Sequence, residues 1–453
     1  MKLLSPREES RYGENRRRTV APEPGAAPAA PAVPIQGRIA RLRVRLLRAV
    51  GQDIGLYPKT TGGADGILLA VLVALVAFGV VMVYSASAVL AYRNFDNGQY
   101  YLMRQGIFAL VAVPMMVVLA RIDYHRLRPL TYWIFLIALG LLMVTALGHG
   151  KSAGGAARWI RVGSVHIQPA EIMKVAMIFW LSHTLSKNAE RIRTFAVGFL
   201  PHMLMCGLMV MLCLMQPDFG SAVMIALITV VLLFTAGARL GYLIIAGLIA
   251  APAVIYAVAS KEYRMRRILA YLDPFAHQND EGYQVAESLM SFGAGGVTGV
   301  GIGDSRQKLF FLPEAHTDFI SAIVAEELGL LGLLCLIIAY VVIVHRGVLA
   351  AYRAADDYGT YLAVGISLFV GMQAFTNLAV AVGLLPTKGL VLPFMSYGGS
   401  SLLVNCAAMG VLLNVSRPRE VTGAPPREAA VDAGVKKKGA RKGNRLVQAG
   451  GVA

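Results

Sequence analysis

Apolar blocks with almost no charge recur along this chain, each about the twenty residues that an α-helix needs to cross the hydrocarbon core of a bilayer. No other feature limits the fold as strongly. Only 15% of the residues are charged and 56% are hydrophobic, whereas soluble domains carry about 25% charged residues. The sequence therefore predicts an all-α polytopic membrane protein, and it excludes a soluble enzyme, a secreted disulfide scaffold and a disordered protein.

Ten membrane-spanning helices are predicted from these blocks. They run approximately over 66–86, 105–121, 130–147, 169–186, 197–215, 219–236, 240–259, 318–345, 360–383 and 394–415. Loops rich in Lys and Arg then fall on one face together with both basic tails, and the positive-inside rule assigns that face to the cytoplasm. The opposite face receives one large extracytoplasmic loop, 260–317, between helices 7 and 8. We therefore divide the chain into a basic, partly disordered cytoplasmic tail (1–64), a ten-helix membrane domain (65–416) and a second basic cytoplasmic tail (417–453).

The chain is strongly basic, with 43 Lys and Arg against 26 Asp and Glu and a formal net charge of +17. Much of this excess lies in the tails and in short loops beside apolar blocks, which indicates membrane topology rather than nucleic-acid binding. The stretch 39–54 alternates Arg with Leu and Val, which is typical either of an amphipathic helix on an anionic membrane or of a solvated topology signal. The four cysteines lie in or beside apolar blocks without a CxxC pair, so we expect small buried hydrophobes rather than disulfides or a zinc site.

The first group of candidate functional residues surrounds the start of the fourth block. Glu171 and Lys174 stand three residues apart and can form an ion pair on one helical face. Structural and functional roles are both open for this pair, because ionisable groups at a membrane entry must face a protein interior or water. Arg158 and Arg161 suit bidentate phosphate binding. Trp159 could stack on a sugar or belong to the interfacial aromatic belt.

The second group lies at the end of the large loop, where Glu314, His316 and Asp318 come directly before or at the start of the eighth block. A half-buried carboxylate is disfavoured as an anion, which would raise the pKa of Asp318 toward the range of a general base. A protonated His316 would oppose that shift. The alternative is an aspartate that caps the helix, which leaves Glu314 and His316 unexplained. Glu326 and Glu327 follow inside the span, and at least one of them must find a partner.

The third group surrounds the start of the last block. Lys388 is a cation in an outer-face loop, and Ser396, Tyr397, Ser400 and Ser401 supply hydroxyl groups beside two glycines. The hydroxyl groups could bind a ligand, but small residues also allow helices to approach closely, which is a good structural alternative.

Two further polar sites favour structural roles. Asp218 can cap the next span, with Gly220 permitting a tight turn. Gln373 and Asn377, four residues apart in the ninth block, are typical of partners in interhelical hydrogen bonds.

A candidate carboxylate and several cations thus gather on the extracytoplasmic face, at the membrane boundary. This arrangement suits an amphiphile with an anionic phosphate head and a lipid tail. It does not suit an ion channel, which needs a repeated ring of ligands.

Five ordered motifs resemble those of the SEDS family (shape, elongation, division and sporulation), the polytopic peptidoglycan glycosyltransferases, over about 66–417. They are Ala157-Arg-Trp-Ile160, Gln168-Pro-Ala-Glu171 with Lys174, Gln216-Pro-Asp-Phe-Gly220, Pro313-Glu-Ala-His-Thr-Asp-Phe319 with Ala325-Glu-Glu-Leu-Gly329, and Leu392-Pro-Phe-Met-Ser-Tyr-Gly-Gly-Ser-Ser401. The segments 386–389 and 313–316 and the long basic N-terminal tail resemble the division branch more closely than the elongation branch. One departure is His166, which stands where relatives often carry arginine and leaves Arg158 or Arg161 as the permanent cation of that loop.

The resemblance implies a peptidoglycan glycosyltransferase that polymerises lipid II, the undecaprenyl-pyrophosphoryl disaccharide pentapeptide, during septal cell wall synthesis at the cytoplasmic membrane. It implies that Asp318 is the catalytic residue, which takes a proton from the acceptor hydroxyl while cations hold the departing pyrophosphate. The substrate-binding residues that we predict are Arg158, Trp159, Arg161, Glu171, Lys174, Glu314, His316, Lys388, Ser396 and Ser400.

The resemblance also implies partners. A class B penicillin-binding protein is expected to supply transpeptidation, other division proteins are expected to bind, and nucleic acid is not. No cofactor is certain, although a divalent cation, Mg²⁺ or Mn²⁺, could assist at the pyrophosphate; no dedicated set of metal ligands is visible in the sequence. A lipid II flippase, an elongation polymerase and a scaffold that only recruits the penicillin-binding protein stay in competition. A flippase needs a polar path across the membrane, whereas the ionisable residues here gather toward one face.

Overall fold

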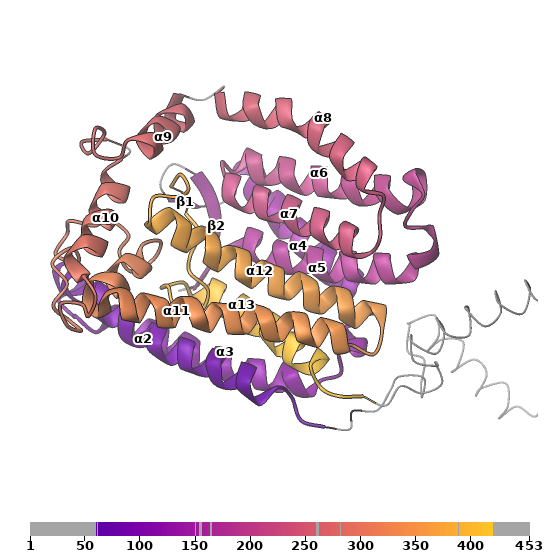
Figure 1. Cartoon of the computed structure of the whole chain (residues 1–453), viewed down its shortest axis with the longest axis horizontal. Coiled ribbons are helices and arrows are strands. Elements are labelled where there is room, and N and C mark those ends of the chain that lie inside the picture. The colour runs from indigo at the N-terminus through magenta and orange to yellow at the C-terminus, as the bar shows by residue number, and fades with distance from the viewer. Residues whose placement is uncertain are drawn as a thin grey trace, which may run out of the picture. The chain divides into compact units, whose positions relative to one another are not determined.

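The structure of the protein is a computed structural model (Figure 1). It describes residues 60, 62–149, 151–153, 156–163, 165–259, 262–280, 282–387 and 389–419. The predictions for most of the two tails, for the amphipathic stretch 39–54 and for Lys388 fall outside the described residues.

Long helices make up most of the described chain, because in a membrane only a helix satisfies its backbone polar groups within one segment. They are α2 (Gly66–Phe95), α3 (Tyr100–Arg121), α4 (Thr131–Val144), α5 (Pro169–Lys187), α6 (Leu200–Met215), α7 (Phe219–Thr235), α8 (Leu240–Ala259), α9 (Glu262–Leu272), α10 (Tyr283–Gly295), α11 (Ile320–Arg353), α12 (Asp357–Ala381) and α13 (Gly399–Val415). Short helical turns lie at η1 (Tyr124–Leu127), η2 (Thr145–His149), η3 (Ala189–Arg191) and η4 (Phe195–Phe199).

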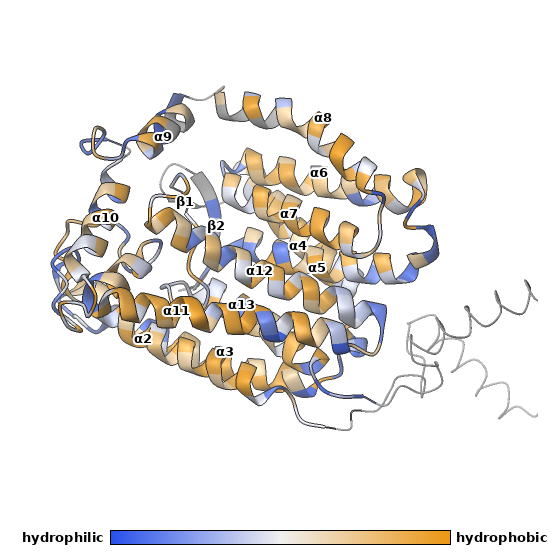
Figure 2. Cartoon of the chain, viewed as in Figure 1, coloured by the Kyte–Doolittle hydropathy of each residue, from blue (hydrophilic) through white to orange (hydrophobic). Residues whose placement is uncertain are grey.

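Six of the described helices are long and apolar enough to cross a membrane. They are Gly66–Phe95, Tyr100–Arg121, Thr131–Gly148, Phe195–Met215, Ile320–Arg353 and Asp357–Ala381, and three shorter apolar helices are Phe219–Thr235, Leu240–Pro252 and Gly399–Val415. Apolar residues cover these helices, and polar residues gather at their ends (Figure 2). The prediction of a helical polytopic chain is confirmed. The count of ten spans and the side on which the large loop lies stay predictions.

The core of the helical part is built around α12. This helix contacts α5, α7, α11 and α13, and 67% of its most apolar stretch is buried, against 17% for the peripheral α3. Gly365 on α12 packs against Ile178 on α5, which is the close approach that small residues allow. Three of the four free cysteines are buried, as expected for small hydrophobes, but Cys335 on α11 is exposed.

A small antiparallel sheet stands between α4 and α5, in a segment for which no element is predicted, so the all-α prediction is wrong here. Its strands are β1 (Lys151–Ala153), β2 (Ala156–Val162) and β3 (Val165–Ile167), in the order β1-β2-β3. Trp159 pairs with Lys151, and Arg161 pairs with His166. Gly163, with a φ of +62°, permits the turn between β2 and β3. The sheet fixes the direction of the Arg-Trp-Ile-Arg run.

The helix α11 is predicted as one continuous span, but it is interrupted at Gly329, whose backbone adopts φ 66° and ψ −164°. Residues 296–301, which follow α10, run across the gap and replace the missing hydrogen bonds. The four bonds run from Val300 N to Glu326 O (3.0 Å), Gly301 N to Glu327 O (3.0 Å), Leu330 N to Gly296 O (2.9 Å) and Leu331 N to Val297 O (3.2 Å). A Cβ atom at Gly329 would collide with the backbone nitrogen of Gly299. This close approach of two backbones therefore requires glycine.

The two acidic residues before the interruption are buried and paired. Glu326 accepts hydrogen bonds from the hydroxyl group of Ser305 and from a neighbouring backbone amide. Glu327 accepts a hydrogen bond of 2.6 Å from Ser85 on α2 and forms an ion pair of 3.0 Å with Lys308. The expectation that at least one of the two residues finds a partner is confirmed, and both of them do. Together these bonds attach the loop segment 303–308 to α2 and α11.

Candidate active site

Asp318 lies at the end of the large loop, two residues before the first residue of α11. The capping alternative is wrong, because Phe319 occupies the N-cap position of α11 and no side chain caps this helix. The side chain of Asp318 is half-buried and makes no hydrogen bond or ion pair with another described residue. A Cβ atom at Gly389 would lie 3.4 Å from its Oδ2 atom. The glycine thus keeps the space directly beside the carboxylate open.

The surroundings of Asp318 favour a base. Burial of the carboxyl group raises the pKa of Asp318 to about 7. The negative charge of Glu314 acts in the same direction, and the positive charge of Arg158 opposes it. A carboxyl group with this pKa is partly deprotonated at neutral pH and can both accept and release a proton. The direction of the shift, which the sequence leaves open, is therefore upward.

The backbone of Asp318 is held by Asn377 on α12. The side-chain amide of Asn377 donates one hydrogen bond of 2.7 Å to the carbonyl group of Asp318 and another of 2.8 Å to that of Leu390. Ser321 on α11 donates a hydrogen bond of 3.3 Å to the side-chain oxygen of the same asparagine. The prediction of an interhelical hydrogen-bond role for Asn377 is confirmed. One amide group thus connects the two loops that flank the carboxylate.

Glu314 sits at the bend of the loop that leads to Asp318. Its φ of +54° lies in the left-handed region, and its carbonyl group accepts hydrogen bonds from the amides of Thr317, Asp318 and Phe319. The hydroxyl group of Thr317 donates a hydrogen bond of 2.7 Å to the side-chain carboxylate of Glu314. The exposed side chain of Glu314 therefore places a negative charge near Asp318.

His316 packs among aromatic rings and is not a permanent cation. Its ring centroid lies 4.8 Å from that of Tyr101 and 5.7 Å from that of Tyr397, and its carbonyl group accepts a hydrogen bond of 2.9 Å from the amide of Tyr397. Burial lowers the pKa of His316 below its ordinary value, against the opposing charge of Glu314. The expectation that His316 supplies positive charge to a pyrophosphate is therefore not supported at neutral pH.

Arg158 on β2 reaches toward the turn before α7. Its Nε donates a hydrogen bond of 3.1 Å to the carbonyl group of Gln216, and its Nη2 donates to that of Pro217. The charge of Arg158 also acts on Asp318. The sheet, the turn before α7 and the loop that carries Asp318 therefore lie near one another. Arg161 is exposed and bonds only to its own turn, at the carbonyl group of Gly163 (2.8 Å), among the described residues.

Glu171 and Lys174 form a buried ion pair of 2.6 Å on α5. The Nζ atom of Lys174 is 5.3 Å from the ring centroid of Phe369, and the side-chain amide of Gln373 lies 3.5 Å from both carboxylate oxygens of Glu171. Gln373 is thus confirmed as an interhelical partner. Lys174 is fully buried, so it does not reach the outer surface in this conformation. The geometry favours the structural alternative, in which the pair locks α5 to α12.

The predicted hydroxyl ligands are engaged with the backbone. Ser396 accepts a hydrogen bond of 2.8 Å from the amide of Leu392 and thereby closes the turn before α13. Ser400 donates a hydrogen bond to the carbonyl group of His166 and so ties α13 to β3. Both side chains are buried. The structural alternative for these serines is therefore favoured.

Asp218 caps α7, as the sequence predicts. Its two carboxylate oxygens accept hydrogen bonds from the amide of Ser221 (3.0 Å) and from the hydroxyl group of the same residue (2.8 Å).

No three His, Cys, Asp or Glu side chains converge in the part of the chain that the structure describes. The carboxylates of Asp318 and Glu314 do not by themselves make the ligand set of an octahedral cation.

Tyr101 is a neighbour of the site that sequence reasoning missed. It lies in α3, and its ring packs against both His316 and Tyr397. The run Tyr100-Tyr101 at the start of a span is the one available signal, but interfacial tyrosines are common in membrane helices. Only the fold reveals which of them face the site.

These features define a polytopic membrane protein with a half-buried carboxylate on a loop, beside an arginine at the end of its helices. A model of the cell cycle protein family of FtsW, RodA and SpoVE matches residues 66–421. The chain belongs to this family, which confirms the resemblance to SEDS proteins.

Individual relatives match over most of their length. The chain is 44% identical to the probable peptidoglycan glycosyltransferase FtsW of Geobacter sulfurreducens, over 82% of this chain and 100% of that protein. It is 40% identical to the stage V sporulation protein E of Bacillus subtilis, over 78% and 97%.

Two solved structures are similar in fold. One belongs to a peptidoglycan synthase complex that coordinates polymerization and crosslinking, with a TM-score of 0.65, 27% identity and coverage of 78% of this chain and 97% of that chain. The other is the rod shape determining protein RodA of Thermus thermophilus, with a TM-score of 0.55, 25% identity and coverage of 78% and 96%.

Proposed function

We propose that this protein is a peptidoglycan glycosyltransferase that polymerises lipid II during septal cell wall synthesis, with Asp318 as its general base. The observation that carries this proposal is the carboxyl group of Asp318, which lies half-buried at the end of the helices with a pKa of about 7 and no described partner. The names of the FtsW relatives support the reaction and its place in cell division. An elongation role is the alternative that the RodA neighbour keeps open.

In the proposed reaction, the deprotonated Asp318 accepts the proton of an acceptor sugar hydroxyl. The hydroxyl oxygen forms a bond to the anomeric carbon of the lipid-linked donor, and the bond from this carbon to the pyrophosphate breaks. The electron pair leaves with the undecaprenyl pyrophosphate, and the proton later passes from Asp318 to water. Raising the pKa by burial matches the base to neutral pH.

The leaving pyrophosphate needs positive charge, which a preorganised site supplies at little reorganisation cost. Arg158 is the cation whose charge acts on Asp318, and the exposed Arg161 on the same strand is available to a phosphate. Trp159 lies between them and could contact the sugar. Lys388 precedes Gly389 in the sequence and stays a prediction. The described residues include no group of three His, Cys, Asp or Glu side chains that could hold a metal ion. The divalent cation stays a prediction, and the proposed reaction contains no step through Mg²⁺ or Mn²⁺.

We further propose a ten-span topology with both termini in the cytoplasm, in the inner membrane at the division septum. The partner that we propose is a class B penicillin-binding protein, which supplies the transpeptidase, together with other division proteins. Support comes from the similar fold of a chain in a peptidoglycan synthase complex that coordinates polymerization and crosslinking.

Polymerisation of purified lipid II by the protein with its partner in detergent tests the proposal. We expect glycan chains from the unchanged protein and from Asp280→Asn, which alters an exposed carboxylate of the same large loop, and none from Asp318→Asn. Unfolding temperature and copurification of the partner verify that Asp318→Asn is folded. Normal glycan synthesis by Asp318→Asn would refute the assignment. Lipid II transport that persists in vesicles without polymerisation would favour the flippase instead.

A further inference from the structure

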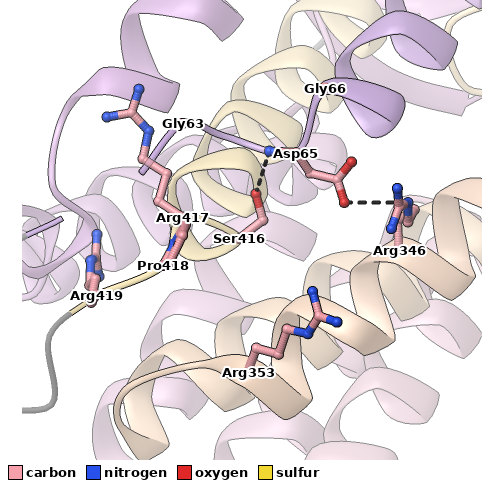
Figure 3. A pocket seen from close by; sticks show the side chains of 9 residues that line it. All are labelled: Gly63, Asp65, Gly66, Arg346, Arg353, Ser416, Arg417, Pro418 and Arg419. Carbon is pink, nitrogen blue, oxygen red and sulfur yellow. Dashed lines mark hydrogen bonds and ion pairs between the residues drawn. The ribbon is translucent and has the colours of Figure 1, made fainter. Parts of the chain in front are cut away.

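Figure 3 shows a second polar site, which is lined by residues at the start of α2 and at the ends of α11 and α13. It is a cavity of about 460 Å³, within the range of about 300–1,000 Å³ that small-molecule sites occupy. Asp318 comes just before α11, whereas Arg353 in this cavity is the last residue of α11. The cavity therefore belongs to the face from which both tails leave, and it has no part in the proposed chemistry.

The lining of this cavity is strongly basic. It contains Arg346, Arg353, Arg417 and Arg419 but only one acidic residue, Asp65, among the described residues. The carboxylate of Asp65 caps α2 by accepting hydrogen bonds from two backbone amides, and it lies 3.4 Å from the Nε atom of Arg346. The one negative charge is thus already engaged, and the cavity keeps an excess of positive charge.

Several guanidinium donors here lack acceptors in the described part of the chain. The Nε atom of Arg417 and the Nε and Nη1 atoms of Arg419 are buried without a hydrogen-bond partner. The guanidinium group of Arg419 lies over the ring of Tyr124, 4.1 Å from its centroid, and its Nη2 atom donates a hydrogen bond of 2.8 Å to Asn414 and lies 3.4 Å from Asp123. Its charge is thus partly engaged outside the cavity, and the Nε atom of Arg417 is the unpaired donor that these contacts leave unexplained. The dipole of a helix favours a cation at its C-terminus, which accounts for Arg353. It does not account for buried donors without acceptors, which are rare in native proteins.

We propose that this cavity binds the phosphate group of an anionic phospholipid from the adjoining membrane leaflet. Guanidinium groups bind phosphate oxygens through paired, charge-assisted hydrogen bonds, and basic pockets between the ends of membrane helices are typical headgroup sites. A bound phosphate would join the start of α2 to the ends of α11 and α13, three elements from distant parts of the chain (Figure 3).

The described part of the chain begins and ends beside this cavity. Thr60 and Arg419 form an isolated β-bridge, so the N-terminal and C-terminal tails leave the membrane domain next to the cavity. Both tails carry more Lys and Arg than Asp and Glu. Their net positive charge favours an anionic membrane surface.

Native mass spectrometry of the full chain in detergent, titrated with dioleoyl-phosphatidylglycerol, tests this site. The variant Arg353→Gln/Arg417→Gln removes two cations and leaves the contact between Asp65 and Arg346 intact. We expect it to bind the lipid about tenfold more weakly, as the loss of charge-assisted hydrogen bonds predicts. The matched control Arg121→Gln removes an exposed cation at the end of α3 and should bind like the unchanged protein. Unfolding temperatures without added lipid verify that each variant is folded.

Two further arms identify the source of the phosphate. Dioleoyl-phosphatidylcholine has the same tails and no net charge, and it should bind more weakly than phosphatidylglycerol. Inorganic phosphate should not displace the bound lipid. Equal binding of phosphatidylglycerol by the double variant and by Arg121→Gln would overturn the proposal, and so would displacement by inorganic phosphate, which would indicate a site for a soluble anion. If the double variant does not fold, Arg353→Gln alone changes one exposed side chain and should still weaken binding.

Discussion

Asn377→Leu removes the amide group that holds the backbone of Asp318. Leucine has a similar volume, so the main change is the loss of hydrogen bonds. The carbonyl groups of Asp318 and Leu390 lose their donors at 2.7 and 2.8 Å. Each buried carbonyl without a partner costs about 1–3 kcal/mol, so the free energy of unfolding should fall by about 2–6 kcal/mol. The two loops beside the carboxylate are the segments that this substitution destabilises.

Catalysis should suffer together with stability. A displacement of about 1 Å at a reacting group can cost about 10²-fold in rate, and Asn377→Leu frees the loop that carries Asp318. We expect glycan synthesis from lipid II, followed on gels, to fall by about two orders of magnitude. Thermal unfolding in the same detergent measures the accompanying loss of stability.

Gln373→Leu is the matched control, one helical turn earlier on α12. Its hydrogen bonds to Glu171 are 3.5 Å long, and Glu171 keeps its ion pair of 2.6 Å with Lys174. This variant should retain most of the glycan synthesis. If Asn377→Leu is as active as the unchanged protein, or if both variants lose activity equally, then the asparagine does not act through the position of Asp318.

Three further outcomes follow from the same structure. Polymerisation should rise with pH through about 7, because Asp318 must be deprotonated to accept a proton, and Glu314→Gln should move the midpoint to lower pH by removing a charge that raises this pKa. Gly329→Ala should lower the unfolding temperature, since a φ of 66° costs an alanine about 1–3 kcal/mol before any collision with residue 299 is counted. Lys308→Met should lower the free energy of unfolding by about 3–5 kcal/mol, because it leaves the buried charge of Glu327 without its cation, and Lys308→Met/Glu327→Gln should recover part of that loss.

Control variants and a double variant test these three predictions. Asp280→Asn changes an exposed carboxylate and should leave the pH midpoint where it is. Gly207→Ala adds a methyl group to a helix position with no atom within 4 Å and should not lower the unfolding temperature. An unmoved midpoint in Glu314→Gln would contradict the charge assignment. Equal stability of the two alanine variants would contradict the backbone contact, and a double variant no better than Lys308→Met would contradict the ion pair.

The parts of the fold that the sequence predicts are those that depend on local physics. An apolar block that is long enough to cross a bilayer can be recognised from the sequence alone, so the long helices could be predicted. The cap at Asp218 and the pair of Glu171 with Lys174 also span only three residues. Such interactions form within one helical turn, whatever the rest of the chain does.

The interruption of α11 and the small sheet are not local in this sense. The interruption at Gly329 is stable because residues 296–301 replace the missing hydrogen bonds of the helix. A single glycine in an apolar block does not indicate that another segment will pack there. The strands of the sheet are three to seven residues long. Short stretches of this kind carry too little periodicity to be distinguished from a loop.

The chemistry of the site divides in the same way. The identity of a carboxylate at the end of the large loop could be predicted, but its pKa depends on burial and on the charges of Glu314 and Arg158. The lowered pKa of His316 depends on its burial, to which rings from α3 and from the loop before α13 contribute. Both pKa shifts depend on residues that are distant in the sequence, and the sequence does not show that these residues are close in space.

The position of the proposed base is fixed by bonds that cross long stretches of sequence. Ser305 and Glu326 are separated by 21 residues, and Asp318 and Asn377 by 59. The first bond holds the loop on the side of α10, and the second holds its last residues against α12. A loop restrained at both ends keeps its carboxylate in place without any hydrogen bond to the carboxylate itself, which leaves that group available to a substrate. It follows that a substitution at Asn377 in α12, which carries none of the proposed reacting groups, should affect polymerisation as strongly as many substitutions in the loop.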